Sequence, residues 1–371
     1  MATHTWLIVP QQQLIFDLMP EDDLRAYCDP ANPENPFFDF VGNKGVVNKL
    51  CRMLYTALCR ENHDMSDTNL ALLGPASCGK TTLAKRLAKG AGLPFIEANP
   101  KEIGSNHDLF QKICRVLAQP GYTHGDGTPV DLSIRPYNDA YHYIAPPIVI
   151  LIDEGHQMPK DVQGGLLTAT EKSDHKLITG EGVILDTSNI CWILATTERG
   201  RLGTALDSRF VKATLKPSNQ FEMALIVHRN RPAVPLVVCE RIALLCGRVA
   251  REAIDFATEV RAERRRSGCE WLDAVETIRK EHGIDEYGMP DAHLEILKTL
   301  AANGPISKYA LRDVANCEVE ELDEYILPII RRSGLIQTTS RGVGITPGGL
   351  AQLEKRGLGV VGRLEQPRAG R

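Results

Sequence analysis

The sequence predicts a three-layer α/β domain with a parallel sheet, followed by smaller and mainly helical parts. Three short apolar runs, Asn69–Leu73, Pro147–Glu154 and Ile190–Thr197, are bounded by loop residues, as buried parallel strands are. Helical patterns lie between them, and the glycine-rich stretch GPASCGKTT directly follows the first run. Strands that alternate with helices are typical of a parallel sheet covered by helices on both faces.

Composition sets limits on the kind of protein. The 371 residues suit two or three domains, and 43% hydrophobic with 24% charged residues is ordinary for a soluble globular chain. No apolar run approaches the ~18 residues that a membrane helix needs, so we expect no membrane partner, and the N-terminus lacks the pattern of a signal peptide. The ten cysteines form no C-x-x-C pair, which favours reduced thiols in a cytoplasmic protein. The net charge of −4 excludes a global polycation, so any contact with DNA must come from a local basic surface.

The glycine-rich stretch is predicted to bind phosphate. It satisfies G-x-x-x-x-G-K-[ST] with Gly74, Gly79, Lys80 and Thr81, between a strand and a helix. The glycines let backbone N–H groups turn inward around phosphate, and the helix N-terminus adds partial positive charge. Lys80 supplies a charge for the β- and γ-phosphates. The expected nucleotide-binding residues are Gly74, Pro75, Ala76, Ser77, Cys78, Gly79, Lys80, Thr81 and Thr82. The thiol of Cys78 also predicts sensitivity to thiol reagents.

Acidic residues follow the second predicted strand. Asp153 stands at its carboxyl end, where open α/β sheets bind ligands, and with Thr81 it fits a Mg²⁺ site. Glu154 fits a residue that polarises an attacking water, which indicates hydrolysis rather than phosphate transfer alone. The guanine-selective N-K-x-D motif is missing, because GNKGVV lacks the aspartate, so we expect ATP rather than GTP.

Two further positions complete the predicted site. Thr196 or Thr197, at the end of the third strand, could hold the nucleophilic water and sense the γ-phosphate. Arg209 in LDSRF follows that strand, and its spacing suggests a residue at a subunit edge that reaches a neighbour's γ-phosphate. Activity would then depend on assembly.

These pieces, in this order, resemble the AAA+ ATPases, and more specifically the RuvB family of hexameric motors that drive Holliday-junction branch migration. FDFVGN, IDEGHQM, LATTERG and LDSRF match segments of that family. The resemblance implies that Phe40 and Val41 line the adenine pocket and that Arg248, in ERIALLCGRVAREA, contacts the nucleotide from a small lid domain. It also implies a ring, a hexamer by analogy, and a RuvA-like junction-binding partner at the hairpin ITGEGVILD.

The last third of the chain resembles the winged-helix DNA-binding domain of the same family. The carrying segments are LEILKTLAANGPISKYALRDV and EELDEYILPIIRRSGLIQTTSRG. The sequence supports this independently, because apolar residues at helical spacing precede Gly304 and Pro305, which end that helix. The basic residues Arg331, Arg332 and Arg341 near the wing are candidate phosphate contacts.

The chain departs from the family at several positions. Glu198 stands where the family has an arginine after the sensor threonines, and Asp207 replaces the first arginine of the finger segment. Val343 occupies a wing position that is often a second arginine. The Gly- and Pro-rich segment from Gln119 to Pro147 is extra and is expected to be a long loop.

We therefore expect an ATP- and Mg²⁺-dependent motor that moves on duplex DNA or a four-way junction. The alternatives are an AAA+ DNA loader or target-DNA switch without sustained translocation, and an ATP-gated DNA-binding regulator. The expected divisions are an N-terminal extension (1–35), an AAA+ large domain (36–216), a helical lid (217–288), a winged helix (289–360) and a tail (361–371).

Overall fold

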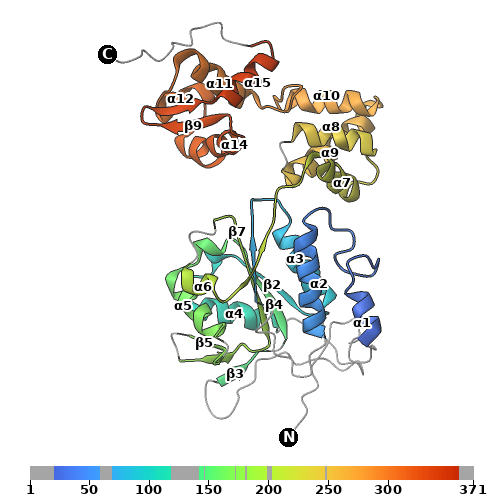
Figure 1. The fold of residues 1–371 in the computed structure, drawn as a ribbon, viewed down its shortest axis with the longest axis vertical. Coiled ribbons are helices and arrows are strands. Elements are labelled where there is room, and N and C mark those ends of the chain that lie inside the picture. The colour runs from blue at the N-terminus through green and yellow to red at the C-terminus, as the bar shows by residue number, and fades with distance from the viewer. Residues whose placement is uncertain are drawn as a thin grey trace, which may run out of the picture. The chain divides into compact units, whose positions relative to one another are not determined.

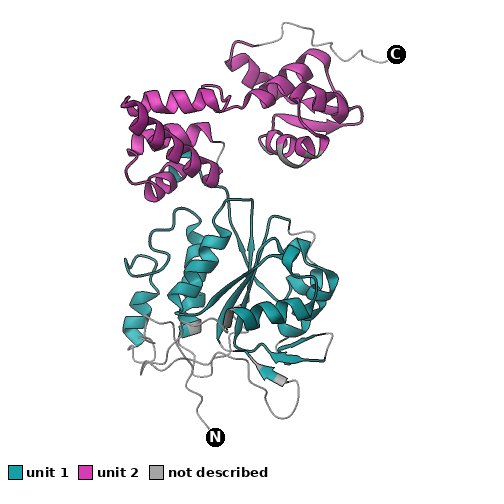
Figure 2. Ribbon diagram, turned by 180° about the vertical axis from the view of Figure 1, so that it is seen from behind, with its two compact units in different colours: residues 1–222 teal, residues 223–371 magenta. Residues whose placement is uncertain are grey.

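The structure is a computed structural model that describes residues 21–58, 69–117, 142–145, 147–171, 173–179, 182–198, 203–246 and 249–358. The chain divides into two compact units, residues 1–222 and 223–371 (Figure 2). Each unit has its own apolar interior. No helix in the described ranges is long and apolar enough to cross a membrane.

A five-stranded parallel sheet forms the centre of the first unit. Its order is β2-β4-β7-β1-β8, and every neighbouring pair is parallel. The strands are β1 (Leu70–Leu73), β2 (Phe95–Ala98), β4 (Ile148–Ile152), β7 (Ile190–Thr196) and β8 (Val211–Thr214). All residues of β1, β4 and β7 are buried, which explains why these three strands read as continuous apolar runs.

Helices cover both faces of this sheet (Figure 1). One face, which includes Ile150 and Trp192, packs with residues of α4 and α5, and the other, which includes Leu72 and Leu151, packs with residues of α2 and α3. Alternate residues of each strand therefore enter different cores. The helices of this unit are α1 (Glu21–Tyr27), α2 (Lys44–Leu58), α3 (Lys80–Gly90), η3 (Pro100–Glu102), α4 (Asn106–Leu117), η4 (Gly155–Gln157), α5 (Lys160–Ala169), α6 (Thr204–Asp207) and, reaching into the second unit, α7 (Gln220–Asn230). The predicted three-layer arrangement is confirmed.

Some strands lie where the sequence did not predict them. The sequence analysis missed the edge strands β2 and β8. A second, three-stranded sheet consists of β3 (His142–Ile144), β6 (Ile184–Asp186) and β5 (Lys176–Ile178). Its antiparallel strands β5 and β6 form the hairpin expected at ITGEGVILD, whereas β3 was not expected. Its strand β3 falls inside the segment from Gln119 to Pro147, so a continuous loop was wrong there. The rest of that segment lies outside the described residues, except for Ala145 and Pro147.

The second unit begins with a helical part. Its helices after α7 are α8 (Leu236–Leu245), α9 (Ala250–Ser267) and α10 (Trp271–Glu281). They share one apolar core that contains Val238, Phe256 and Val275. The helix α9 ends with a basic turn, Arg264–Arg266, followed by Gly268 in a left-handed conformation (φ 71°).

The later part of the second unit has a winged-helix architecture and a separate core around Leu297, Leu311 and Leu353. Its elements are α11 (Asp291–Asn303), α12 (Lys308–Ala315), α13 (Val319–Glu321), the π-helical turn η6 (Leu322–Ile326), α14 (Leu327–Arg332), β9 (Ile336–Thr339), β10 (Gly342–Ile345) and α15 (Pro347–Lys355). The antiparallel pair β9–β10 is the wing. Gly342 is required there, because its φ is 124° and a Cβ would lie 2.2 Å from the Ile306 carbonyl oxygen.

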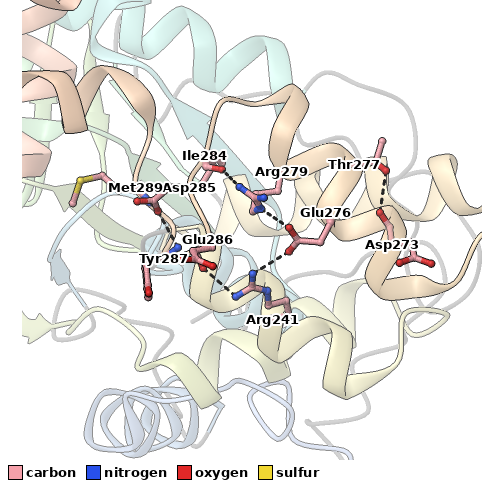
Figure 3. Close-up of polar contacts among 10 residues, drawn as sticks. All are labelled: Arg241, Asp273, Glu276, Thr277, Arg279, Ile284, Asp285, Glu286, Tyr287 and Met289. Atoms are coloured by element: carbon pink, nitrogen blue, oxygen red, sulfur yellow. Dashed lines mark hydrogen bonds and ion pairs between the residues drawn. The ribbon is translucent and has the colours of Figure 1, made fainter. Parts of the chain in front are cut away.

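The segment 282–290 connects the helical part to the winged-helix part, and charged side chains hold it in place (Figure 3). Glu276 accepts hydrogen bonds from Arg241 (Nη2 to Oε1, 3.0 Å) and from Arg279 (Nε to Oε2, 2.7 Å). The same two guanidinium groups donate onward to backbone carbonyls of the segment, Arg241 to Glu286 and Arg279 to Ile284. The helical part thus holds the segment by its backbone.

The winged-helix part holds the same segment from the other side. Asp285 pairs with Arg356 at the end of α15 and also accepts the N–H groups of Tyr287 (2.9 Å) and Met289 (2.8 Å). The Tyr287 ring lies under the cations of Arg356 and Lys355, at 4.9 and 4.7 Å from the ring centroid. Contacts with both neighbouring parts of the unit therefore hold the segment.

Candidate nucleotide site

The predicted phosphate loop connects β1 to α3. Gly74 and Gly79 have positive φ values of 150° and 93°, and a Cβ on Gly74 would lie 2.7 Å from the Leu215 carbonyl oxygen. Both positions therefore need glycine. The helix α3 begins at Lys80, and no side chain caps its first turn. Its N–H groups are available to an anion.

Lys80 is bound to its own loop. Its side chain is buried, and Nζ donates to the carbonyl oxygens of Gly74 and Pro75, each at 2.9 Å. These neutral acceptors hold the ammonium group over the loop. A phosphate oxygen would be a stronger, charge-assisted partner for the same donors.

The side chains of Thr81 and Asp153 contact one another at the carboxyl end of the sheet. Asp153 directly follows β4, and its Oδ2 accepts a hydrogen bond from the Thr81 hydroxyl at 3.1 Å. The two residues are 72 positions apart in sequence. A hydroxyl and a carboxylate that converge beside a phosphate loop are oxygen ligands of the kind that Mg²⁺ prefers, so these residues fit a Mg²⁺ site.

Glu154 lies next to this pair in an unusual backbone conformation. It has φ 50° and ψ 46°, and its N–H donates to Asp153 Oδ1 at 3.0 Å. Its carboxylate accepts from the Thr197 hydroxyl, with Oγ1 3.2 Å from Oε2. A left-handed conformation costs a non-glycine residue on the order of 1–3 kcal/mol and is often found at functional sites.

His156 is a site residue that the sequence analysis missed. Its Nδ1 lies 2.9 Å from the Thr196 hydroxyl oxygen and 3.3 Å from Glu154 Oε2, and its Nε2 lies 3.7 Å from Glu198 Oε1. The histidine of IDEGHQM was quoted only as part of a family segment. Its position two residues after Glu154 was the available signal.

Arg209 contacts an acidic residue of its own chain. Its Nη2 lies 2.5 Å from Glu171 Oε2, across 38 residues of sequence. This hydrogen bond raises the pKa of Arg209 and lowers that of Glu171, so both groups are charged. Within the described residues, no polar contact joins Arg209 to Lys80 or Asp153.

The remaining predicted loop and adenine-pocket residues lie around the phosphate loop. The Phe40 ring covers Gly79, where a Cβ would come within 2.9 Å of its Cζ. Val41, Pro75, Ser77 and Cys78 are partly buried, and Ala76 and Thr82 are exposed. Burial raises the pKa of the Cys78 thiol, although nearby Lys80 acts in the opposite direction, so the expected thiol sensitivity is weakened at neutral pH.

The other predicted residues belong to the second unit. Arg248 lies outside the described residues. Arg331 and Arg341 are exposed, and Arg341 lies in the turn of the wing, where its N–H donates to Thr339 Oγ1 at 3.2 Å. The side chain of Arg332 lies outside the described part. Two of the three arginines proposed from the sequence are therefore exposed, and Arg341 lies on the wing.

Comparisons with known proteins agree with both units. Residues 70–218 match the model of the AAA family, ATPases associated with various cellular activities, and residues 286–354 match the RuvB C-terminal winged helix domain. No curated protein sequence matches the chain significantly.

Solved structures share the fold. The Thermotoga maritima RuvB Holliday junction branch migration motor is 22% identical, with a TM-score of 0.62 over 85% of this chain and 95% of that one. Two single-substitution variants of it are each 23% identical and cover 85% of this chain, with TM-scores of 0.62 and 0.63 over 96% and 95% of their own chains. The chain therefore combines an AAA ATPase domain with a RuvB-type C-terminal winged helix domain, and it shares the fold of these RuvB structures.

Proposed function

We propose that this protein hydrolyses ATP to move duplex DNA and to drive branch migration of four-way junctions. The carrying observation is the convergence of Lys80, Thr81, Asp153 and Glu154 at one sheet edge, in a chain with a RuvB-type winged helix. The solved RuvB structure is titled a Holliday junction branch migration motor, which supports the same use of the fold.

The phosphate loop and its neighbours would bind the nucleotide. Lys80 exchanges its two loop carbonyls for β- and γ-phosphate oxygens, and Phe40 with Val41 packs against the adenine. Thr81 and Asp153 would hold Mg²⁺, which supplies charge neutralisation at the β- and γ-phosphates when bound.

Hydrolysis requires an oriented water molecule. Glu154 would accept its proton, and Thr197 would orient it, because the Thr197 hydroxyl already bonds the Glu154 carboxylate. Thr196 is less suited, since it is buried and its hydroxyl bonds His156 and the Glu198 N–H. Arg209 would reach the γ-phosphate of a neighbouring subunit, and Arg248 would contact it from the lid.

Assembly and DNA binding complete the proposal. Six subunits would form a ring. Each subunit would have the domain boundaries expected from the sequence. Arg331, Arg332 and Arg341 would bind DNA phosphates. The β5–β6 hairpin would bind a RuvA-like junction protein. The cytoplasm is the expected location, because cysteines stay reduced there.

A junction assay tests this function. The full chain, Mg²⁺-ATP and a fluorescent four-way junction should give DNA-stimulated hydrolysis together with separation of the junction into duplexes. Lys80→Ala should abolish nucleotide binding and both activities, because it removes the phosphate-binding cation. Junction separation by Lys80→Ala would contradict the mechanism. Hydrolysis without separation would favour the loader, and slow turnover with site-specific binding would favour the regulator.

A further inference from the structure

We propose that His156 is a positioning residue that holds the Glu154 carboxylate against the end of β7, with Glu198 as the second anchor of its ring. This inference rests on the proposed role of Glu154 in hydrolysis. It assigns a task to a histidine that binds neither phosphate nor metal in the proposed mechanism.

The imidazole of His156 is a buried group between two more exposed carboxylates. Its side chain is 5% exposed, whereas those of Glu154 and Glu198 are 38% and 48% exposed. Nδ1 lies within 3.3 Å of Glu154 Oε2, and Nε2 lies 3.7 Å from Glu198 Oε1. The buried ring can therefore restrict a carboxylate that solvent alone would leave free to rotate.

A proton on Nδ1 lets the ring act as donor to two oxygens. The hydroxyl of Thr196 already accepts the Glu198 N–H at 3.0 Å and still has a free lone pair. An Nδ1–H group can donate to this oxygen at 2.9 Å and lies 3.3 Å from the Glu154 carboxylate, which can only accept. One proton would thus tie the catalytic carboxylate to the strand end.

Glu154 needs such support. Its backbone is in the left-handed region, which the chain leaves readily when surrounding contacts are lost. Thr197 holds the same Oε2 oxygen from an exposed position, with Oγ1 at 3.2 Å. His156 approaches the same oxygen from the buried side, with Nδ1 at 3.3 Å, so the two contacts hold it from different directions.

Glu198 contributes to this arrangement through both its side chain and its backbone. Its carboxylate faces the ring, with Oε1 3.7 Å from Nε2. Its N–H also bonds Thr196 Oγ1. The side chain and backbone of Glu198 therefore fix both the ring of His156 and the hydroxyl that the ring contacts.

Three substitutions of His156 test the assignment. Asparagine places an amide near the Nδ1 position, glutamine reaches toward the Nε2 position, and alanine removes both. A misplacement of about 1 Å at a catalytic group costs on the order of 100-fold in rate. We expect His156→Ala and His156→Gln to lower kcat by about that factor and His156→Asn to stay within about tenfold of the wild type.

ATP binding provides the control. The dissociation constant of a fluorescent ATP analogue should change less than about threefold in all three variants, because Lys80, Thr81 and Asp153 are untouched. Wild-type kcat in His156→Ala would overturn the inference. So would His156→Asn as slow as His156→Ala while nucleotide binding is retained, because Nδ1 would then have no special role.

Glu154→Gln separates this inference from the proposed function. If Glu154→Gln hydrolyses ATP at the wild-type rate, the role of Glu154 itself is wrong. If Glu154→Gln is inactive but His156→Ala is fully active, only the positioning role fails. Glu198→Gln should lower kcat by less than His156→Ala, since it keeps the backbone bond to Thr196.

Discussion

Arg209 is bound to Glu171, with Nη2 2.5 Å from Oε2. The arginine that we propose to act on a neighbour's nucleotide is therefore held by a carboxylate of its own subunit. The two side chains are 29% and 40% exposed, so water screens the attraction between them. A γ-phosphate, which carries more charge, can compete for the guanidinium at small cost.

Arg209→Ala should stop hydrolysis and leave ATP binding intact. Loss of such an arginine removes about 10³–10⁵ in turnover, because charge that develops on the transferred phosphoryl group is no longer stabilised. Turnover and analogue binding are measured on the same preparation. Mixing Arg209→Ala with Glu154→Gln subunits should restore activity, since a Glu154→Gln neighbour donates an intact Arg209 to a site that keeps Glu154.

Glu171→Gln is the matched control for this prediction. It removes the charge that holds Arg209 but keeps the arginine, so turnover should stay within about tenfold of the wild type. Normal turnover by Arg209→Ala alone would refute the finger assignment.

Alkylation of Cys78 should be slow at neutral pH and should accelerate with rising pH. Burial raises the pKa of this thiol, and only the thiolate reacts. The rate, followed by mass spectrometry of the peptide that contains Cys78, should rise about tenfold per pH unit below the pKa. Saturating ATP analogue should protect the thiol because the phosphates cover the loop.

Cys78→Ser distinguishes this site from the other cysteines, eight of which are free thiols in the described part of the chain. It should retain ATPase activity, because the loop binds phosphate through backbone N–H groups, and should resist inactivation by the reagent. Fast alkylation that does not depend on pH would contradict the raised pKa.

The sequence predicted the strands correctly where a single run of apolar residues identifies a strand. The strands β1, β4 and β7 are buried on both faces, so each is a continuous apolar run. The edge strands β2 and β8 expose Glu97 and Val211, and with four residues each they carry too short a pattern. Neighbouring strands, rather than their own composition, make them part of the sheet.

In the candidate site, too, local motifs were predicted and contacts between distant residues were not. Lys80 and Thr81 follow from one motif, and Asp153 with Glu154 follows from the end of one strand. The contact of Glu171 with Arg209 spans 38 residues, and that of His156 with Thr196 spans 40. No spacing rule links such pairs, because the folded sheet brings them together.

Arg341→Ala should weaken DNA binding without loss of ATP hydrolysis in the absence of DNA. Its exposed side chain lies at the turn of the wing, where a cation can reach a phosphate. Loss of one phosphate contact should reduce the slope of log affinity against log salt by about 1. Fluorescence anisotropy with duplex DNA at several salt concentrations measures this.

Arg266→Ala provides the comparison, because that arginine is 74% exposed but pairs with Glu263 in the helical part. Its salt slope should equal that of the wild type. An unchanged slope in Arg341→Ala would remove the wing from the DNA surface.

Asp285→Asn should destabilise the second unit, and the effect should depend on pH. Burial would raise the pKa of Asp285, but hydrogen bonds from Arg356 and from the N–H groups of Met289 and Tyr287 together lower it. A lowered folded-state pKa means that the contribution is complete above the ordinary carboxyl pKa and is lost as the pH falls through the folded value. Asparagine leaves the guanidinium, 5% exposed, without its counterion.

The expected loss at pH 7 is about 1–3 kcal/mol in the free energy of unfolding, measured by hydrogen exchange at amides of α10 and α11 during urea titration. Asp313→Asn, in a pair whose carboxylate is 68% exposed, should cost less than about 1 kcal/mol. The difference between wild type and Asp285→Asn should shrink as the pH falls below about 4, because protonation then neutralises the wild-type carboxylate as well. A difference that persists unchanged at low pH would mean that packing around the turn, and not the Asp285–Arg356 pair, holds the two parts of the unit together.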